Sequence, residues 1–62
     1  MGYKIKEVRE EKRMTQEELA EKSGVSRSTI VALEKGTMND VKMSTLQKLA
    51  SAMDTTVQKI FF

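Results

Sequence analysis

Two consecutive segments, each preceded by a hydroxyl residue and followed by a glycine, constrain the fold of this chain most. Thr15 precedes the first segment and Gly24 follows it, while Ser26 and Gly36 bracket the second. A hydroxyl at a helix start accepts a hydrogen bond from a free amide, and glycine adopts the left-handed conformation that ends many helices. The spacing therefore predicts two short helices joined by a tight turn, Ser23-Gly24-Val25.

The starts of these two helices differ in their capping residues. Glu18 stands three residues after Thr15 and completes a capping box, in which each side chain bonds the other residue's backbone. Ser26 is expected to cap the second helix, but Thr29 occupies the position of the capping-box glutamate. The sequence therefore predicts a full capping box for the first helix only.

Apolar residues at helical spacing predict three further helices. One covers residues 4–12, where Ile5 and Val8 share a face. Another covers residues 43–53, and a last helix begins after Thr56, which is expected to cap it. The apolar positions of these last two helices are Leu46, Leu49, Ala50 and Met53, then Val57, Ile60 and Phe61. No segment alternates as a strand does, so we expect an all-α fold of five helices.

The length and the residue types missing from the chain limit how it is stabilised. A chain of 62 residues is expected to form one domain, covering residues 1–62, with only a small core. It contains no cysteine and no histidine, so we expect no disulfide, no metal site and no cofactor, and no small-molecule ligand is evident. Good helix packing or dimerisation remain as sources of stability. Met14, Met43 and Met53 are expected to fill the core.

The charges are nearly balanced, so their positions matter more than their sum. The net charge is +2, and Glu17, Glu18 and Glu21 lie together in the first capped helix. Any surface for nucleic acid must be local, formed by Arg27, Lys35 and Lys42 with help from Lys6, Lys12 and Arg13. The charged N-terminal region predicts no signal peptide, and no apolar run is long enough to span a membrane. We therefore expect a cytoplasmic protein.

The two capped helices meet the physical demands of a helix-turn-helix at residues 16–35. Ala20 is small where the helices approach, and Gly24 supplies the backbone freedom of the turn. In this motif the second helix enters the major groove of DNA. The residues expected on the free face of that helix are Arg27, Ser28, Val31, Ala32 and Lys35, none of them acidic.

Three motifs carry a resemblance to a known family. They are Gln16-Glu17-Glu18-Leu19-Ala20, Gly24-Val25-Ser26-Arg27-Ser28-Thr29-Ile30 and Leu33-Glu34-Lys35-Gly36. Together with the flanking helices they resemble the Cro/CI-type (XRE) helix-turn-helix family over nearly the whole chain. The resemblance implies a five-helix, lambda-repressor-like DNA-binding domain. The loop at residues 37–42 departs from the family, which usually has a shorter loop with a proline and a capping serine or threonine, so the phosphate contacts of that loop are in doubt.

The resemblance implies a role for individual residues. It implies that Arg27, Ser28 and Ala32 contact bases, and that Gln16, Ser26 and Thr29 contact phosphates or base edges. It also implies that Gln16 braces the second capped helix. Lys35 is expected to add a phosphate contact, and Lys42, near the position of the missing cap, is expected to substitute for the phosphate contacts of the loop. Arg9 and Glu34 match a structural salt bridge, and the last helix, with Val57, Ile60, Phe61 and Phe62, matches a dimer interface.

Ordinary structural roles stand beside these functional ones. Arg27 is otherwise a solvated arginine, and Gln16 a polar residue in a first turn. Ala32 either contacts a thymine methyl group or only permits close approach, and Lys35 also complements the helix dipole. Phe61 and Phe62 either cover the chain's own core or contact a partner.

The predicted function is sequence-specific binding of a roughly palindromic operator in double-stranded DNA by a homodimeric transcriptional regulator. The alternative is an antitoxin or adaptor that uses the same fold to bind a protein. An enzyme is not expected, because the chain lacks histidine, cysteine and a paired-carboxylate arrangement.

Overall fold

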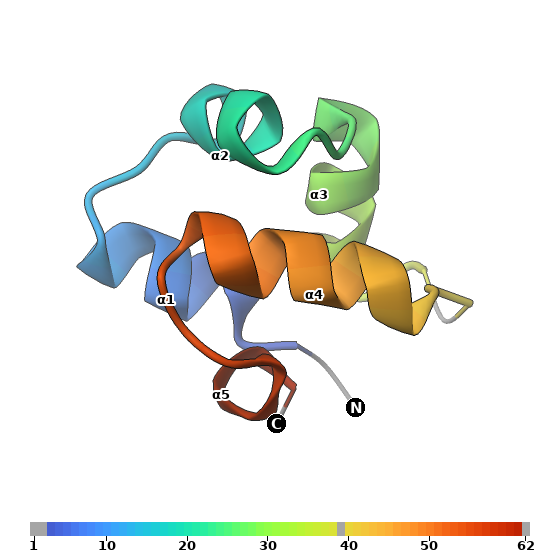
Figure 1. The fold of residues 1–62 in the computed structure, drawn as a ribbon. Coiled ribbons are helices and arrows are strands. Elements are labelled where there is room, and N and C mark those ends of the chain that lie inside the picture. The colour runs from blue at the N-terminus through green and yellow to red at the C-terminus, as the bar shows by residue number, and fades with distance from the viewer. Residues whose placement is uncertain (1–2, 39, 62) are drawn as a thin grey trace.

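A computed structural model describes residues 3–38 and 40–61 of the chain. The helices in it are α1 (Ile5–Glu11), α2 (Gln16–Ser23), α3 (Arg27–Lys35), α4 (Met43–Ala52) and α5 (Val57–Ile60). Figure 1 shows α4 crossing the middle of the molecule, with α2 and α3 above it and α5 below it as drawn. The described residues contain no strand, and the predicted all-α fold class is confirmed.

The start of α2 has the capping box that the sequence predicts. The amide of Glu18 donates to Thr15 Oγ1 at 3.0 Å, and the amide of Thr15 donates to Glu18 Oε1 at 2.8 Å. These two bonds satisfy amides that would otherwise lack a partner within the helix. The first turn of α2 is therefore fixed by residues adjacent in the sequence, which is why its start was predictable.

The turn between α2 and α3 is held by backbone and hydroxyl contacts. Gly24 has φ +77°, in the left-handed region, and its amide donates to the carbonyl of Ala20 at 2.9 Å. The amide of Val25 donates to Ser23 Oγ at 3.1 Å. Glycine at this φ carries no steric penalty, so the chain turns within the three residues 24–26 and α3 begins at Arg27.

The core draws side chains from every helix and from the turn. Its buried members are Ile5, Leu19, Val25, Ile30, Leu33, Leu46, Leu49, Ala50, Met53 and Ile60. Contacts run from α2 to both α3 and α4, from α1 to α3, and from α4 to α5. Most of the apolar residues at helical spacing in the sequence are thus the buried residues of the core. Ile30 and Leu33, on the inner side of α3, pack that helix against the core.

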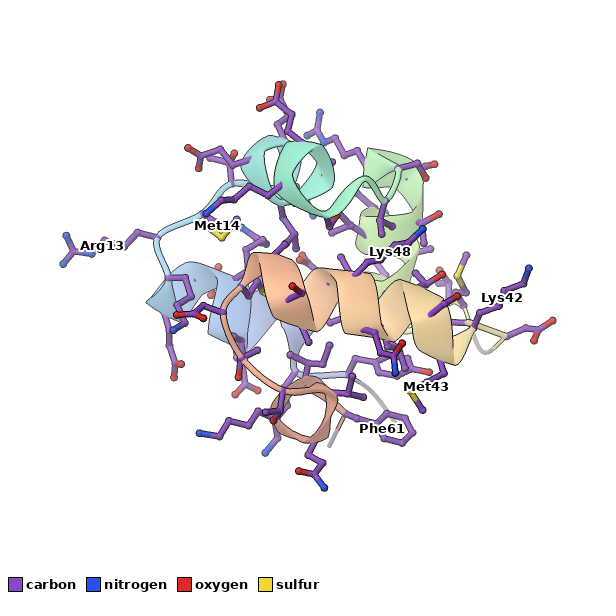
Figure 2. The ribbon with its side chains drawn as sticks, viewed as in Figure 1. Arg13, Met14, Lys42, Met43, Lys48 and Phe61 are labelled. Carbon is purple, nitrogen blue, oxygen red and sulfur yellow. The ribbon has the colours of Figure 1, made fainter. Side chains whose placement is uncertain are left out.

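Two predictions for α4 and α5 are wrong. Met43 was expected in the core, but its side chain is 55% exposed, because it is the first residue of α4 and projects from that end of the helix (Figure 2). Thr56 was expected to cap α5 with its side chain, but it makes no such hydrogen bond. Both predictions used the local sequence only, which does not show what packs around the ends of a helix.

The prediction for Ile60 also needs correction. It was placed in a dimer interface, but its side chain is 0% exposed within a single chain. Its carbonyl accepts a hydrogen bond from the amide of Lys4 at 2.7 Å, which ties α5 to the start of the chain. Ile60 is therefore a core residue and is not available to a second copy.

Phe61 lies outside α5, although the sequence placed it in the last helix. Its backbone is extended and forms an isolated antiparallel bridge with Tyr3. The two aromatic rings stack with their centroids 5.5 Å apart. Pairing with the N-terminal segment ends the helix at Ile60 and leaves the Phe61 side chain 46% exposed.

Candidate nucleic-acid interface

The outer face of α3 is polar and small. Arg27, Ser28 and Lys35 are exposed, and Val31 and Ala32 are half-buried between them. These five positions follow one another at helical spacing, opposite the buried Ile30 and Leu33. The face carries positive charge at both ends of α3 and no acidic side chain, so a polyanion meets no repulsion there.

Three hydroxyl groups gather at the start of α3. Ser26 Oγ accepts from the amide of Thr29 at 3.3 Å and lies 2.9 Å from Thr29 Oγ1. It also lies 3.3 Å from Ser28 Oγ. Ser26 therefore acts as the cap of α3, and Thr29, which cannot replace a capping-box glutamate, bonds the cap through its hydroxyl instead.

Glu34 is the one acidic residue of α3, and it turns away from the outer face. Arg9 Nε donates to Glu34 Oε2 at 2.7 Å, and Arg9 Nη2 donates to Glu34 Oε1 at 3.1 Å. The side chains are only 11% and 5% exposed, respectively. This bidentate ion pair joins α1 to the last turn of α3 and neutralises the carboxylate close to the outer face.

The ion pair extends to α2 and to the link before it. Gln16 Nε2 donates to Glu34 Oε1 at 3.0 Å, and Arg9 Nη1 donates to the carbonyl of Met14 at 2.8 Å. The hydrogen bonds to Glu34 raise the pKa of Arg9 above its ordinary value, although partial burial acts in the opposite direction. Gln16 is thus braced against α3 at the N-terminus of α2, where free amides favour an anion.

Lys42 lies outside the helix pair. It precedes α4, and its side chain makes no capping hydrogen bond. Figure 2 shows this side chain pointing away from the molecule at the start of α4. Lys42 is therefore exposed, as is Lys35 at the end of α3, and neither belongs to an ion pair within the described residues.

The residues predicted for a dimer interface are only partly brought together at the surface. Val57 is half-buried, Phe61 is exposed, and Phe62 lies outside the described residues. Figure 2 shows Phe61 and Met43 projecting on the same side of the molecule as drawn. The exposed apolar groups at this end of the fold are thus Phe61 and Met43, and the sequence did not indicate Met43.

In residues 3–38 and 40–61, no group of acidic side chains is arranged to hold a metal ion. Each helix of this part of the chain is too short or too polar to cross a lipid bilayer.

The fold and the α2–turn–α3 geometry define a helix-turn-helix domain. A family model described as helix-turn-helix matches residues 5–60. The chain belongs to the Cro/CI-type (XRE) helix-turn-helix family. The resemblance that the three motifs carried is therefore confirmed.

Individual relatives agree with this membership. An uncharacterized HTH-type transcriptional regulator of Archaeoglobus fulgidus is 44% identical over 61 residues, covering 98% of this chain and 84% of the relative. The immunity repressor protein of Bacillus phage phi105 is 38% identical, covering 97% of this chain and 41% of the repressor. The crystal structure of the restriction-modification controller protein C.AhdI from Aeromonas hydrophila matches with a TM-score of 0.86 at 36% identity, covering 94% and 86% of the two chains. None of these three is named as an enzyme.

Two parts of the candidate site were missed or incomplete in the sequence. The resemblance implied that Gln16 braces the second capped helix, but its partner there, Glu34, is far away in the sequence and no local pattern indicates it. Lys6 was noted only as a general basic residue, but α1 brings it to the same hollow as Gln16 and Lys35. Its position depends on how α1 packs against α3, which spacing within α1 does not show.

Proposed function

We propose that this protein is a transcriptional regulator that binds specific sites in double-stranded DNA through α3. The observation that carries the proposal is the outer face of α3, which is polar and cationic, while the single acidic residue of α3, Glu34, is tied to Arg9. A helix of this kind, following a capped helix and a tight turn, fits the major groove. The relatives named as transcriptional regulators and as a phage repressor support the same role.

The proposed base contacts come from the N-terminal part of α3 and one residue further along. Arg27 is exposed at the first position of the helix, where its guanidinium can donate two hydrogen bonds to a guanine. Ser28 is exposed beside it, and Ala32 lies one turn further along. Arg27 is the residue to which we assign most of the sequence discrimination, because its two donors match the acceptor pair of one base only.

Phosphate contacts are proposed on both sides of α3. Gln16 stands at the N-terminus of α2, Lys35 at the end of α3 and Lys42 before α4. Ser26 and Thr29 are proposed to touch the DNA backbone or base edges at the start of α3. Phosphate contacts set the position and affinity of the protein on DNA, whereas base contacts set its preference for sequence.

We propose that two copies bind one operator. Phe61, Met43 and Val57 offer apolar surface at the end of the fold formed by α5 and the start of α4. Joined there, two copies would place their α3 helices in successive major grooves, about 34 Å apart, on a roughly palindromic site. We assign the protein to the cytoplasm, because such a regulator must act where the DNA lies.

The alternative role, binding of a protein by an antitoxin or adaptor, makes a different demand on α3. Its outer face would then be free to carry acidic or large apolar groups, and in the structure it carries neither. No contact in the described residues favours that role over DNA binding.

Selection of duplexes from a random DNA library tests the proposal. The wild-type chain is expected to enrich one sequence arranged as an inverted repeat, with half-site centres about 10 base pairs apart. Sedimentation of the protein with the enriched duplex is expected to give two chains per duplex. A library that shows no enrichment after repeated rounds contradicts sequence-specific binding, and one chain per duplex contradicts the dimer.

A further inference from the structure

A hollow lies at the junction of α1, α2 and α3. Its volume is about 360 Å³, and its lining residues are Lys6, Arg9, Gln16, Val31, Glu34 and Lys35. The lining carries three positive side chains and one carboxylate. That carboxylate, on Glu34, is bonded to Arg9, so the charges of Lys6 and Lys35 stand without a compensating acid in the hollow.

Lys6 contributes to this hollow from α1, outside the helix-turn-helix. It is exposed and lies one helical turn before Arg9, so the two side chains share a face of α1. That face is directed to α3, because Arg9 bonds Glu34 there. Within residues 3–38 and 40–61, no carboxylate lies at ion-pair distance from Lys6, including Glu10 on the following turn.

We propose that Lys6 binds a phosphate of the DNA backbone at this hollow, so that the DNA-binding surface extends from the helix-turn-helix onto α1. The inference rests on the proposed function, because Gln16 and Lys35, which also line the hollow, are proposed phosphate contacts next to the outer face of α3. DNA held against α3 therefore has its backbone beside the hollow. An ammonium group binds phosphate as a point charge, so Lys6 contributes affinity and not sequence preference.

The dependence of DNA affinity on salt concentration measures this contact. Each phosphate that a protein neutralises adds about 0.9 to the slope of log affinity against log salt concentration. The slope is to be measured by fluorescence anisotropy for wild type, Lys6→Ala, Lys6→Gln and Lys6→Arg, on the selected duplex and on a scrambled one. The matched control is Lys22→Ala, which removes the same charge from the side of α2 that borders Ala52.

The expected result is a slope smaller by about 0.9 per bound chain for Lys6→Ala and Lys6→Gln, equally on both duplexes. Lys6→Arg is expected to keep the wild-type slope, and Lys22→Ala to stay close to it. Thermal unfolding followed by circular dichroism shows which of the two neutral variants, Lys6→Ala or Lys6→Gln, folds as wild type, and the slope of that variant is used. If wild type binds DNA but both neutral variants match Lys22→Ala, the inference about Lys6 is overturned and the proposed function stands. If wild type does not bind duplex DNA at all, both are overturned.

Discussion

Gln16 and Glu34 are joined by a hydrogen bond of 3.0 Å, from the side-chain amide at the start of α2 to the carboxylate in the last turn of α3. The same carboxylate oxygen accepts from Arg9 Nη2, so a single oxygen links three helices. Ala20, Leu19 and the turn set the apolar packing of α2 on α3, but this polar contact lies at the rim of that packing. Glu34 is therefore the residue through which α1 and α2 both hold the last turn of α3.

Replacement of Glu34 by alanine is expected to reduce the free energy of unfolding by about 3 kcal/mol, because it leaves the partly buried Arg9 without its carboxylate. The loss is large for a chain of 62 residues, whose total stability is on the order of 3–9 kcal/mol. Urea denaturation measures it, with Glu21→Ala on the exposed side of α2 as the control, expected within about 0.5 kcal/mol of wild type. Equal losses in the two variants would show that the ion pair does not support the fold.

The caps of α2 and α5 give a second comparison between residues of the same type. Thr15→Ala is expected to cost about 1 kcal/mol of stability, because Thr15 Oγ1 accepts the Glu18 amide. Thr56→Ala is expected to cost less than about 0.5 kcal/mol, because Thr56 makes no capping bond with its side chain. Thermal unfolding of the two variants side by side checks this order, and a larger loss for Thr56→Ala would contradict the assigned caps.

Thr15 and Thr56 also show which helix caps can be predicted from the sequence and which cannot. The capping box of Thr15 and the glycine ends of α2 and α3 involve residues close in the sequence, so local chemistry predicts them. The state of Thr56 depends on the path of the chain into α5, which no local pattern specifies. The start of a helix is predictable where two residues can form reciprocal capping bonds, whereas a lone threonine before an apolar run does not suffice to predict a side-chain cap.

Ile60 and Phe61 are neighbours with opposite surroundings, and their variants are expected to behave differently. Ile60→Ala is expected to lower the free energy of unfolding by about 2–5 kcal/mol, because the side chain is fully buried. Phe61→Ser is expected to cost only about 1 kcal/mol, the value of its stacking on Tyr3, while it weakens self-association. Denaturation and sedimentation over a concentration series separate the two effects. Unchanged association of Phe61→Ser would remove this residue from the proposed dimer interface.

Ile60 and Phe61 also show what apolar spacing in the sequence cannot predict. Spacing gave Ile60 and Phe61 the same expected surroundings, but Phe61 leaves the helix to pair with Tyr3. Met43 has helical spacing with Leu46 and is nevertheless exposed, because it lies at the end of α4. The contents of the core were therefore largely predictable, whereas the position of its edge required the packed structure.

The candidate DNA-binding site also has residues that could be predicted from the sequence and residues that could not. Arg27, Ser28 and Ala32 were placed on one face by the helical period, and the structure has them on the outer side of α3. The hydrogen bond from Gln16 to Glu34 and the position of Lys6 arise from the packing of α1 and α2 against α3. Residues that one helix presents could be predicted from spacing. Of the contacts between helices, the Arg9–Glu34 pair was expected from the family resemblance, whereas the partner of Gln16 and the position of Lys6 were not.

The central claim is that Arg27 on the outer face of α3 selects the DNA sequence, and the ratio of affinities for the selected and a scrambled duplex measures this most directly. We predict that Arg27→Ala reduces the ratio by about 5-fold to 150-fold for each bound chain, since a bidentate contact to guanine discriminates by about 1–3 kcal/mol. The control is Arg13→Ala, which removes the same charge from the link between α1 and α2, where Figure 2 shows Arg13 projecting away from α3. It is expected to leave the ratio unchanged. An Arg27→Ala variant that folds as wild type and keeps the full ratio would contradict the account.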